Sequence, residues 1–282
     1  TATIIVSSNA ERKIHNDRMA MRHAQQHGLV IFKWRNQLIG SSSTGFNAVH
    51  LDHIYKRHQA ELISTFVAGA PAFLTENIRT ERRLANGTAI TLHSLVLTPE
   101  QLVDEALQSQ IRTSSAGTII ELGSPPFAVN VILSSETPSM WPQDKRLPDE
   151  QHGDLVIIPL RPRQASDCIN LFGRRKQFVR YKYHAYQLGF SCTFHKVQGK
   201  TLARVILDLN KRPNGSPKVQ VTSQGIYVGL TRVVSAKDIR IFPLTHLSAN
   251  YLKQLRVNPN LPKWIRYLRR QPDGRGFKFQ MP

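Results

Sequence analysis

The sequence predicts an α/β domain that is interrupted by a β-rich insertion, and three observations lead to this fold class. The chain opens with a short β-branched run, a helical pattern and a second apolar run. From Ser64 to about Arg180 it changes to short apolar runs separated by glycine and proline, and after Tyr186 the alternation of strand-like and helical patterns returns. Alternating strands and helices are typical of a parallel sheet, whereas many short strands with frequent turns indicate a β-rich unit.

The first region supplies one strand–helix–strand unit. Thr3–Val6 is an apolar run that ends at small polar residues, which predicts a buried strand. Asn9 is expected to cap a helix that runs from Ala10 to about His27, in which apolar residues recur at helical spacing: Ile14, Met21 and Ala24. Gly28 is expected to end this helix, and Leu29–Trp34 to form the second strand of a parallel sheet.

The middle region is expected to form a small β-barrel or a related β-rich insertion. A loop rich in Ser and Gly at Asn36–Asn47 and a polar helix near Leu51–Ile63 precede it. Its short apolar runs predict strands at Thr65–Val67, Ala72–Leu74, Ala89–Leu97, Thr118–Leu122, Ala128–Leu133 and Leu155–Leu160. Thr98-Pro99-Glu100 predicts the start of one helix, and Asp104-Glu105 is expected within it as surface structure rather than as a metal-holding pair.

The last region returns to the α/β pattern and ends in a basic tail. It predicts a buried strand at Arg204–Leu209, a helix at Gln224–Val234 and a final strand at Ile239–Phe242. Tyr251–Pro282 then carries eight basic residues against one acid, with aromatic residues between them. Interleaved cations and aromatics suit phosphates and bases, and the alternative is a solvated tail whose aromatics dock on the body.

The strongest compositional feature is positive charge. The 282 residues (32.0 kDa) contain 38 Lys and Arg against 19 Asp and Glu, which gives a net charge of +19. This excess favours a polyanionic partner, while a basic ribosome-like protein or a membrane-surface protein stays compatible with composition alone. No apolar run approaches the about 18 residues of a membrane span, so no membrane partner is expected.

The two cysteines, Cys168 and Cys192, form no CxxC pair, so neither a disulfide framework nor a metal site is expected and a reducing compartment is the default. Because the chain begins at Thr1 without Met, we expect a fragment or a trimmed product.

Two stretches carry the most chemical information. Thr193–Leu202 reads Thr-Phe-His-Lys-Val-Gln-Gly-Lys-Thr-Leu, and Tyr227–Val233 reads Tyr-Val-Gly-Leu-Thr-Arg-Val. Gly199-Lys200-Thr201 is not a phosphate-binding P-loop, because Phe194 stands where that motif needs its first glycine for the backbone to wrap the phosphates.

These stretches resemble motifs V and VI of the superfamily 1B DNA helicases of the PIF family and of the related, RecD-like helicases of Helitron transposons. Phe66–Asn77 and Leu84–Thr88 resemble the segment that opens the inserted barrel of that family, and Ser8-Asn9, followed by Asn16, resembles its motif IV. The matches occur in the family's order.

The resemblance implies a fold and a division into units. The fold would be the second RecA-like domain of a helicase, a parallel sheet with flanking helices, interrupted by a small Src-homology-3-like barrel. Residues 1–63 and 184–246 would form the two parts of the RecA-like domain, 64–183 the β-rich insertion and 247–282 a basic C-terminal extension.

The resemblance also implies roles for individual residues. Arg232 would be the catalytic arginine finger, a group that contributes a rate factor of about 10³–10⁵ in other phosphoryl-transfer enzymes, and Gln198 and Gly199 would lie beside it at the nucleotide. DNA would be bound by Ser8, Asn9, Thr193, His195 and Lys196. Taken alone, Arg232 would be an ordinary ion-paired arginine and His195 a structural histidine.

A second cationic group precedes motif V. Arg174, Arg175 and Lys176 belong to a run without acids that is either a solvated loop or an edge that contacts DNA, and we expect DNA contact.

The implied cofactors are ATP and Mg²⁺, and the implied partner is single-stranded DNA. The family further implies a 5′ to 3′ motor, a nuclear location and a part in DNA repair, recombination or transposition. The first RecA-like domain, with the P-loop and the magnesium ligands, is expected to lie outside this sequence, so we expect the chain alone not to hydrolyse ATP. The alternative is a non-catalytic, nucleic-acid-binding remnant of a transposon helicase, and a basic scaffold for acidic proteins is a third, weaker interpretation.

Overall fold

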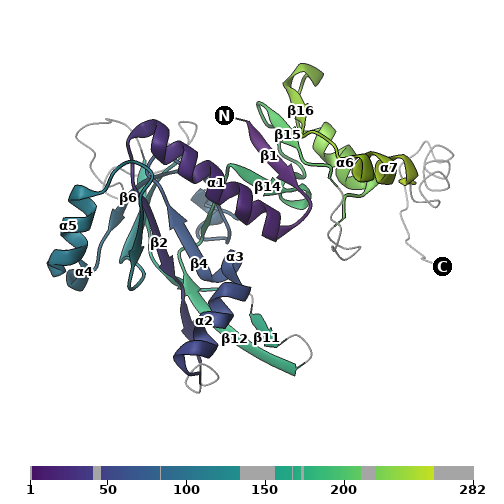
Figure 1. Cartoon of the computed structure of the whole chain (residues 1–282). Coiled ribbons are helices and arrows are strands. Elements are labelled where there is room, and N and C mark those ends of the chain that lie inside the picture. The colour runs from purple at the N-terminus through teal and green to yellow at the C-terminus, as the bar shows by residue number, and fades with distance from the viewer. Residues whose placement is uncertain are drawn as a thin grey trace.

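The structure is a computed structural model that describes residues 2–40, 46–82, 84–133, 156–166, 168–172, 175–210 and 220–256. Its described strands form four sheets, of which one is entirely parallel. Figure 1 shows the parallel sheet at one end of the molecule, a long helix beside it, and the β-rich part at the other end. The predicted fold class, a mixed α/β structure with a parallel sheet, is confirmed.

The parallel sheet has the order β14-β1-β15-β16. Its strands are β1 (Thr3–Val6), β14 (Ser191–Thr193), β15 (Val205–Leu207) and β16 (Ile239–Ile241). Both edges of β1 are paired, which buries its β-branched side chains as the apolar run predicts. Helix α6 (Ser223–Leu230) and the 3₁₀ helices η5 (Phe194–Val197) and η7 (Ala236–Asp238) complete this part, and α7 (His246–Gln254) follows.

Helix α1 (Asn9–His27) begins one residue earlier than expected, because Ser8 and not Asn9 is the cap. The Ser8 hydroxyl accepts a hydrogen bond from the Glu11 amide (3.3 Å), and the Glu11 carboxylate accepts one from the Ser8 amide (3.2 Å). Gly28 ends the helix in the left-handed region (φ 70°), as predicted.

The buried face of α1 differs from the predicted apolar stripe. Ile14 is 50% exposed, whereas Asn16, Ala20 and Ala24 are buried. Asn16 donates to the carbonyls of Leu188 and Ser191 (2.9 and 3.3 Å) and accepts from the Ser191 amide (2.7 Å). The buried side-chain amide of Asn16 therefore fixes the helix to the start of β14. The small side chains of Ala20 and Ala24 allow the helix to pack close to the sheets.

The expected strand–helix–strand unit is wrong in its second strand. Strand β2 (Ile31–Arg35) lies in another sheet, antiparallel to β4 (Ile63–Phe66) and parallel to β7 (Ile119–Leu122). The reason is that both edges of β1 are taken by β14 and β15, while Ile31 and Trp34 are buried in the larger core of the β-rich part.

A five-stranded antiparallel sheet forms the centre of the β-rich part, in the order β13-β5-β6-β8-β9. Its strands are β13 (Tyr186–Leu188), β5 (Pro71–Leu74), β6 (Ala89–Val96), β8 (Ala128–Leu133) and β9 (Ile157–Leu160). The strands predicted from the short apolar runs are thus present within the described residues. The return to the parallel pattern comes at β14 rather than at Tyr186, because β13 pairs antiparallel with β5.

The fourth sheet was not anticipated from the sequence. Strand β12 (Arg175–Tyr183) pairs with β3 (Gln37–Ile39), β10 (Arg163–Gln164) and β11 (Ile169–Phe172), and α2 (Ala48–Arg57) and α3 (Gln59–Leu62) pack beside it. The loop expected at Asn36–Asn47 therefore contains a strand, and the helix expected near Leu51–Ile63 is divided in two. The 3₁₀ helix η2 (Thr80–Arg82) lies between β5 and β6.

The helix predicted at Thr98 is divided into α4 (Pro99–Val103) and α5 (Glu105–Thr113). Thr98 caps α4, and Asp104 caps α5 by accepting from the Leu107 amide (3.1 Å). The Asp104 carboxylate is thereby engaged in local structure. Among the described helices none is both long and apolar enough to cross a bilayer.

The extent of the expected units stays a prediction, as does the Src-homology-3-like form of the insertion. Most of the basic extension, residues 257–282, lies outside the described residues.

Candidate nucleic-acid interface

The predicted DNA-binding residues gather at the carboxyl edge of the parallel sheet. Strands β1 and β14 are parallel neighbours in which Val6 pairs with Thr193. Ser8 and Asn9 follow β1, and η5 follows β14, so both segments leave the sheet on the same edge. Loops at this edge of open α/β sheets are where ligands are commonly bound.

The structure places these residues in different environments. Asn9 and His195 are exposed, whereas Thr193 and Lys196 are half-buried. The hydroxyl of Ser8 is occupied by the Glu11 amide, which makes Ser8 first of all the cap of α1. The motif V stretch begins at the last residue of β14 and leads through η5 to the loop before β15.

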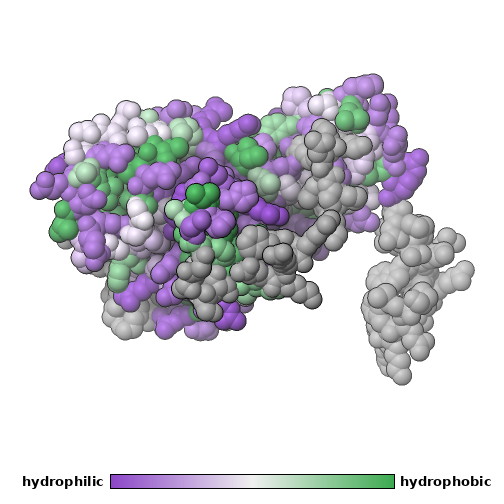
Figure 2. Space-filling view, turned by 60° about the horizontal axis from the view of Figure 1, so that its bottom comes forward, coloured by the Kyte–Doolittle hydropathy of each residue, from purple (hydrophilic) through white to green (hydrophobic). Residues whose placement is uncertain are grey.

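Positive charge accumulates at this edge. The pKa of Lys196 is lowered to about 8, chiefly because the amine is partly buried and also because Arg12 and Lys200 lie nearby. Burial likewise lowers the pKa of Arg12 and that of Lys200. Like charges held together in this way favour an anion between them. On the face shown in Figure 2, hydrophilic residues cover most of the described surface, with hydrophobic residues in small groups between them.

The two motif stretches meet at Arg232. Its Nε donates to the Val228 carbonyl (2.8 Å), and one terminal nitrogen donates to the carbonyls of Val197 (3.4 Å) and Lys200 (3.2 Å). The other terminal nitrogen donates to the Thr231 hydroxyl (2.8 Å), and the Leu202 amide donates to the Arg232 carbonyl (2.7 Å). Arg232 is half-buried. Through these hydrogen bonds it joins the end of α6 to the loop that carries Gln198 and Gly199.

Gln198 and Gly199 are exposed on this loop. Gly199 has φ +77°, a backbone conformation that favours glycine, and a Cβ there would meet no atom within 4 Å. The backbone is therefore open to approach from outside at this position, which is what the expected nucleotide role of Gly199 needs.

The motif V loop is also fixed to the β-rich part. The Lys200 ammonium donates to the Gly87 carbonyl (2.6 Å) and lies 4.1 Å from the centre of the Phe73 ring. Gly87 belongs to the Asn86-Gly87 turn in the connection between β5 and β6. Its φ is +90°, so it is a position that favours glycine.

The second cationic group is described only in part. Arg174 lies outside the described residues, and for Arg175 and Lys176 the structure describes only the backbone, at the start of β12. These two residues therefore lie in a strand of an antiparallel sheet and not in a loop, and their expected contact with DNA stays a prediction.

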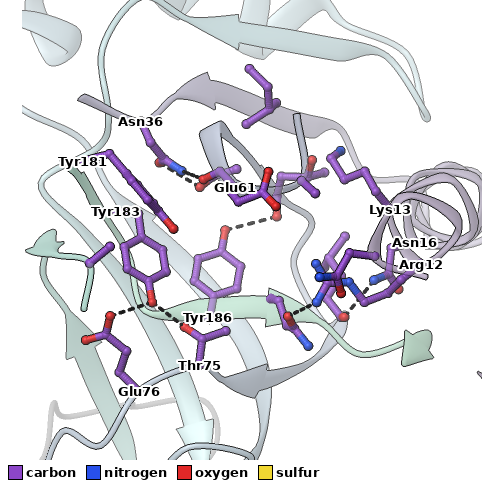
Figure 3. A pocket seen from close by; sticks show the side chains of 18 of the residues that line it. Arg12, Lys13, Asn16, Asn36, Glu61, Thr75, Glu76, Tyr181, Tyr183 and Tyr186 are labelled. Atoms are coloured by element: carbon purple, nitrogen blue, oxygen red, sulfur yellow. Dashed lines mark hydrogen bonds between the residues drawn. The ribbon is translucent and has the colours of Figure 1, made fainter. Parts of the chain in front are cut away.

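A polar pocket with a volume of about 350 Å³ lies next to the carboxyl edge and was not anticipated. Its lining comes mainly from α1, which includes Asn9, from the α3–β4 segment, and from β12 and β13, and it also includes Asn86 and Lys196. Figure 3 shows Arg12, Lys13 and Asn16 on one side and Tyr181, Tyr183 and Tyr186 on the other. The sequence does place Arg12 and Asn16 on one face of a helix and Tyr181 and Tyr183 on one face of a strand. It does not show that these two faces meet, because only the tertiary structure brings α1 and β12 to one cavity.

Some charges that line the pocket are paired within it. Lys13 lies 2.6 Å from Asp17, and Glu76 accepts from the Tyr183 hydroxyl (2.9 Å) and lies 3.1 Å from Arg163. Arg12 donates to the side-chain oxygen of Gln187. Burial raises the pKa of Glu61, an effect that nearby Arg12 partly offsets.

The described residues contain no group of three His, Cys, Asp or Glu side chains placed to hold a metal ion. The implied Mg²⁺ therefore has no such ligand set among the described residues.

Comparison with known proteins identifies the fold. No family model and no curated protein sequence matches the chain. Among solved structures, the Pif1 helicase of Candida albicans matches with a TM-score of 0.52 at 15% identity, over 95% of this chain and 50% of the helicase. Bacteroides Pif1 bound to single-stranded DNA matches with a TM-score of 0.49 at 12% identity, over 95% of this chain and 46% of that protein.

The match to the Candida albicans helicase gives the chain a fold related to that of PIF-type helicases, as its motifs V and VI predict. The chain spans about half the length of the helicases it matches.

Proposed function

We propose that the chain is the C-terminal motor half of an ATP-dependent DNA helicase. In this proposal it binds single-stranded DNA at the carboxyl edge of the parallel sheet and supplies Arg232 to an ATP molecule held mainly by a further RecA-like domain. The observation that carries the proposal is the junction at Arg232, where the motif VI helix is hydrogen-bonded to the motif V loop. The fold related to PIF-type helicases supports it.

The DNA-binding half of the proposal rests on charge and position. His195 and Lys196 follow β14 directly, beside Asn9, and these side chains supply donors to a phosphate backbone. Backbone contact is independent of sequence, and it suits a motor that moves along any strand. Arg175 and Lys176 would extend the cationic path along β12.

The nucleotide half rests on the Arg232 junction. A guanidinium has five N–H donors, and the four described bonds leave one donor on a terminal nitrogen. Arg232 would present this donor to a γ-phosphoryl group, with Gln198 and Gly199 at the same face. Arg232 also joins α6 to the motif V loop through its bonds to the Val197 and Lys200 carbonyls. A movement of Arg232 on ATP hydrolysis would therefore shift the loop that follows His195 and Lys196. Mg²⁺, 5′ to 3′ movement, the Src-homology-3-like insertion and a nuclear role belong to the same proposal.

Fluorescence anisotropy with a labelled oligothymidylate tests DNA binding. The logarithm of the affinity is expected to fall linearly with the logarithm of salt concentration, by about 0.7 for each phosphate that the protein neutralises. His195→Ala and Lys196→Ala are expected to weaken binding. Arg112→Ala, which removes an exposed charge on α5, serves as the control and is expected to leave it unchanged. Affinity that does not depend on salt would contradict a cationic interface.

An ATP hydrolysis assay tests whether a further domain is needed to hold the nucleotide. The chain alone is expected to show no turnover above background, because Arg232 has no bound phosphate to act on. Robust hydrolysis by the purified chain that disappears in Arg232→Ala would show that the proposed need for a further domain is wrong.

A further inference from the structure

The polar pocket beside α1 has features of a ligand site that the proposed motor does not use. Its lining includes Asn9 and Lys196, two residues that are also proposed to contact the DNA backbone. Its volume of about 350 Å³ is near the lower end of the about 300–1,000 Å³ of small-molecule sites. It therefore has room for one nucleotide unit and not for a duplex.

Two polar atoms in the pocket make no hydrogen bond among the described residues. The hydroxyl of Thr65 and the side-chain nitrogen of Gln187 are buried and make no hydrogen bond there, and Thr65 is only 6% exposed. Both residues line the pocket. Because an unpaired buried polar group is costly, these atoms indicate a polar ligand that would satisfy them.

The aromatic side of the pocket is held in place. Tyr183 donates to the Glu76 carboxylate (2.9 Å) and is hydrogen-bonded to the Thr75 hydroxyl (2.9 Å), while Tyr186 donates to the Thr65 carbonyl (3.1 Å). Figure 3 shows the rings of Tyr183 and Tyr186 next to each other, with Arg12 beyond Tyr186. Rings fixed by their hydroxyls offer apolar surface for a base without a further loss of freedom.

The opposite side of the pocket is cationic. Arg12 comes from the first turns of α1 and Lys196 from η5, and burial together with the nearby charge of Arg12 lowers the pKa of Lys196 to about 8. Lys13 is paired with Asp17, so Arg12 and Lys196 are the lining cations that make no ion pair among the described residues. A phosphate at this side would lie beside both of them, in the charge-assisted geometry that such groups favour.

We propose that the pocket receives one nucleotide of the bound single strand, turned out of the base stack, with its phosphate at Arg12 and Lys196 and its base against Tyr183 and Tyr186. This inference rests on the proposed function. It adds that the strand would be held in steps of one nucleotide, because one base at a time would occupy the pocket. A free mononucleotide has the same chemistry. The strand is favoured because Asn9 and Lys196, which line the pocket, also belong to the proposed DNA path.

The test compares binding of an oligothymidylate with binding of an abasic oligonucleotide of the same length. Ala60, on α3, lines the pocket, so Ala60→Trp is designed to fill it. Ala106→Trp places the same side chain on the exposed face of α5 and is the matched control. Stacking of one base on an aromatic residue corresponds to about a 5- to 150-fold change in affinity.

The wild type and Ala106→Trp are expected to prefer the thymidylate strand over the abasic strand by the same factor, and Ala60→Trp is expected to lose about 5- to 150-fold of that preference. Equal preference in all three proteins would overturn the pocket inference while leaving DNA binding intact. Absence of DNA binding in all three would overturn the proposed function itself.

Two further measurements keep the inference testable if Ala60→Trp does not fold. Photo-crosslinking of the wild type with a 4-thiothymidine oligonucleotide is expected to label the 181–187 peptide, and labels confined to 193–199 would overturn the inference. Calorimetry with thymidine 5′-monophosphate is expected to show at most weak binding. Tight binding of this mononucleotide, with no effect of the pocket on strand binding, would overturn the strand as the occupant.

Discussion

Gly229 is the position at which the packing of α6 is most sensitive to a single methyl group. A Cβ at Gly229 would lie 2.9 Å from Leu207 Cδ2 and 2.9 Å from Phe194 Cε1, whereas ordinary carbon contacts are about 3.5–4.0 Å. Leu207 and Phe194 are both buried in the small core under the parallel sheet, so neither side chain can turn away into solvent.

We therefore expect Gly229→Ala to destabilise the protein. Overpacking a core costs about 1–3 kcal/mol, and the exchange of Gly for Ala in a helix returns at most about 1 kcal/mol, which leaves a net loss of about 1 kcal/mol. Gly225, one turn earlier in α6, is the matched control. Its added Cβ would meet Thr222 Oγ1 at 3.4 Å and Phe194 Cγ at 3.6 Å, so Gly225→Ala is expected to gain up to about 1 kcal/mol.

Urea unfolding followed by circular dichroism measures both variants. The expected result is a difference of about 2 kcal/mol in the free energy of unfolding, with Gly225→Ala the more stable protein. If Gly229→Ala proved as stable as Gly225→Ala, the close contact between α6, η5 and β15 could not be as the structure has it.

Three further predictions concern pH and a helix cap. In the proposed interface a DNA phosphate binds the protonated amine of Lys196, whose pKa is lowered to about 8 by burial and by the nearby Arg12. Affinity for an oligothymidylate is therefore expected to fall as pH rises through 8, and Lys196→Arg is expected to abolish that fall; a pH-independent wild type would contradict the proposed contact. Burial lowers the pKa of His184 to about 4, so its contribution to stability is complete above pH 6.5 and is lost as pH falls towards 4. Urea unfolding should show about 2 kcal/mol of this loss between pH 7.5 and 5, and a His184→Phe variant with the same loss would rule His184 out as its cause. Ser8→Ala should lower the free energy of unfolding by about 1 kcal/mol and Ser8→Asp should not, and equal losses in the two variants would argue against the capping box.

Local chemistry made several elements predictable from the sequence. Thr98 and Gly28 mark helix ends through their own side chain or backbone freedom, and the β-branched run at Thr3–Val6 fits only a strand with both edges paired. Motifs V and VI could be related to each other because both resemble motifs of one known family and occur in that family's order. The junction at Arg232 gives this relation a physical form.

Features that depend on distant pairing could not be predicted in the same way. Leu29–Trp34 is a good strand in any sheet, and only the occupied edges of β1 exclude it from the parallel one. The three residues of β3 are too few for a pattern, and their pairing with β12 spans more than a hundred positions. The pocket combines segments from α1, α3 and β12, none of which indicates a cavity by itself.

The contact between Lys200 and Gly87 determines where the molecule can bend. The Lys200 carbonyl accepts from Arg232, and its ammonium is bonded to a turn 113 positions earlier in the chain. Lys200 thus connects α6, through Arg232, to the turn between β5 and β6. A rotation that moved the motif V loop away from the β5–β6 turn would have to break the 2.6 Å hydrogen bond between Lys200 and Gly87. A hinge motion that keeps this bond must therefore occur elsewhere in the molecule.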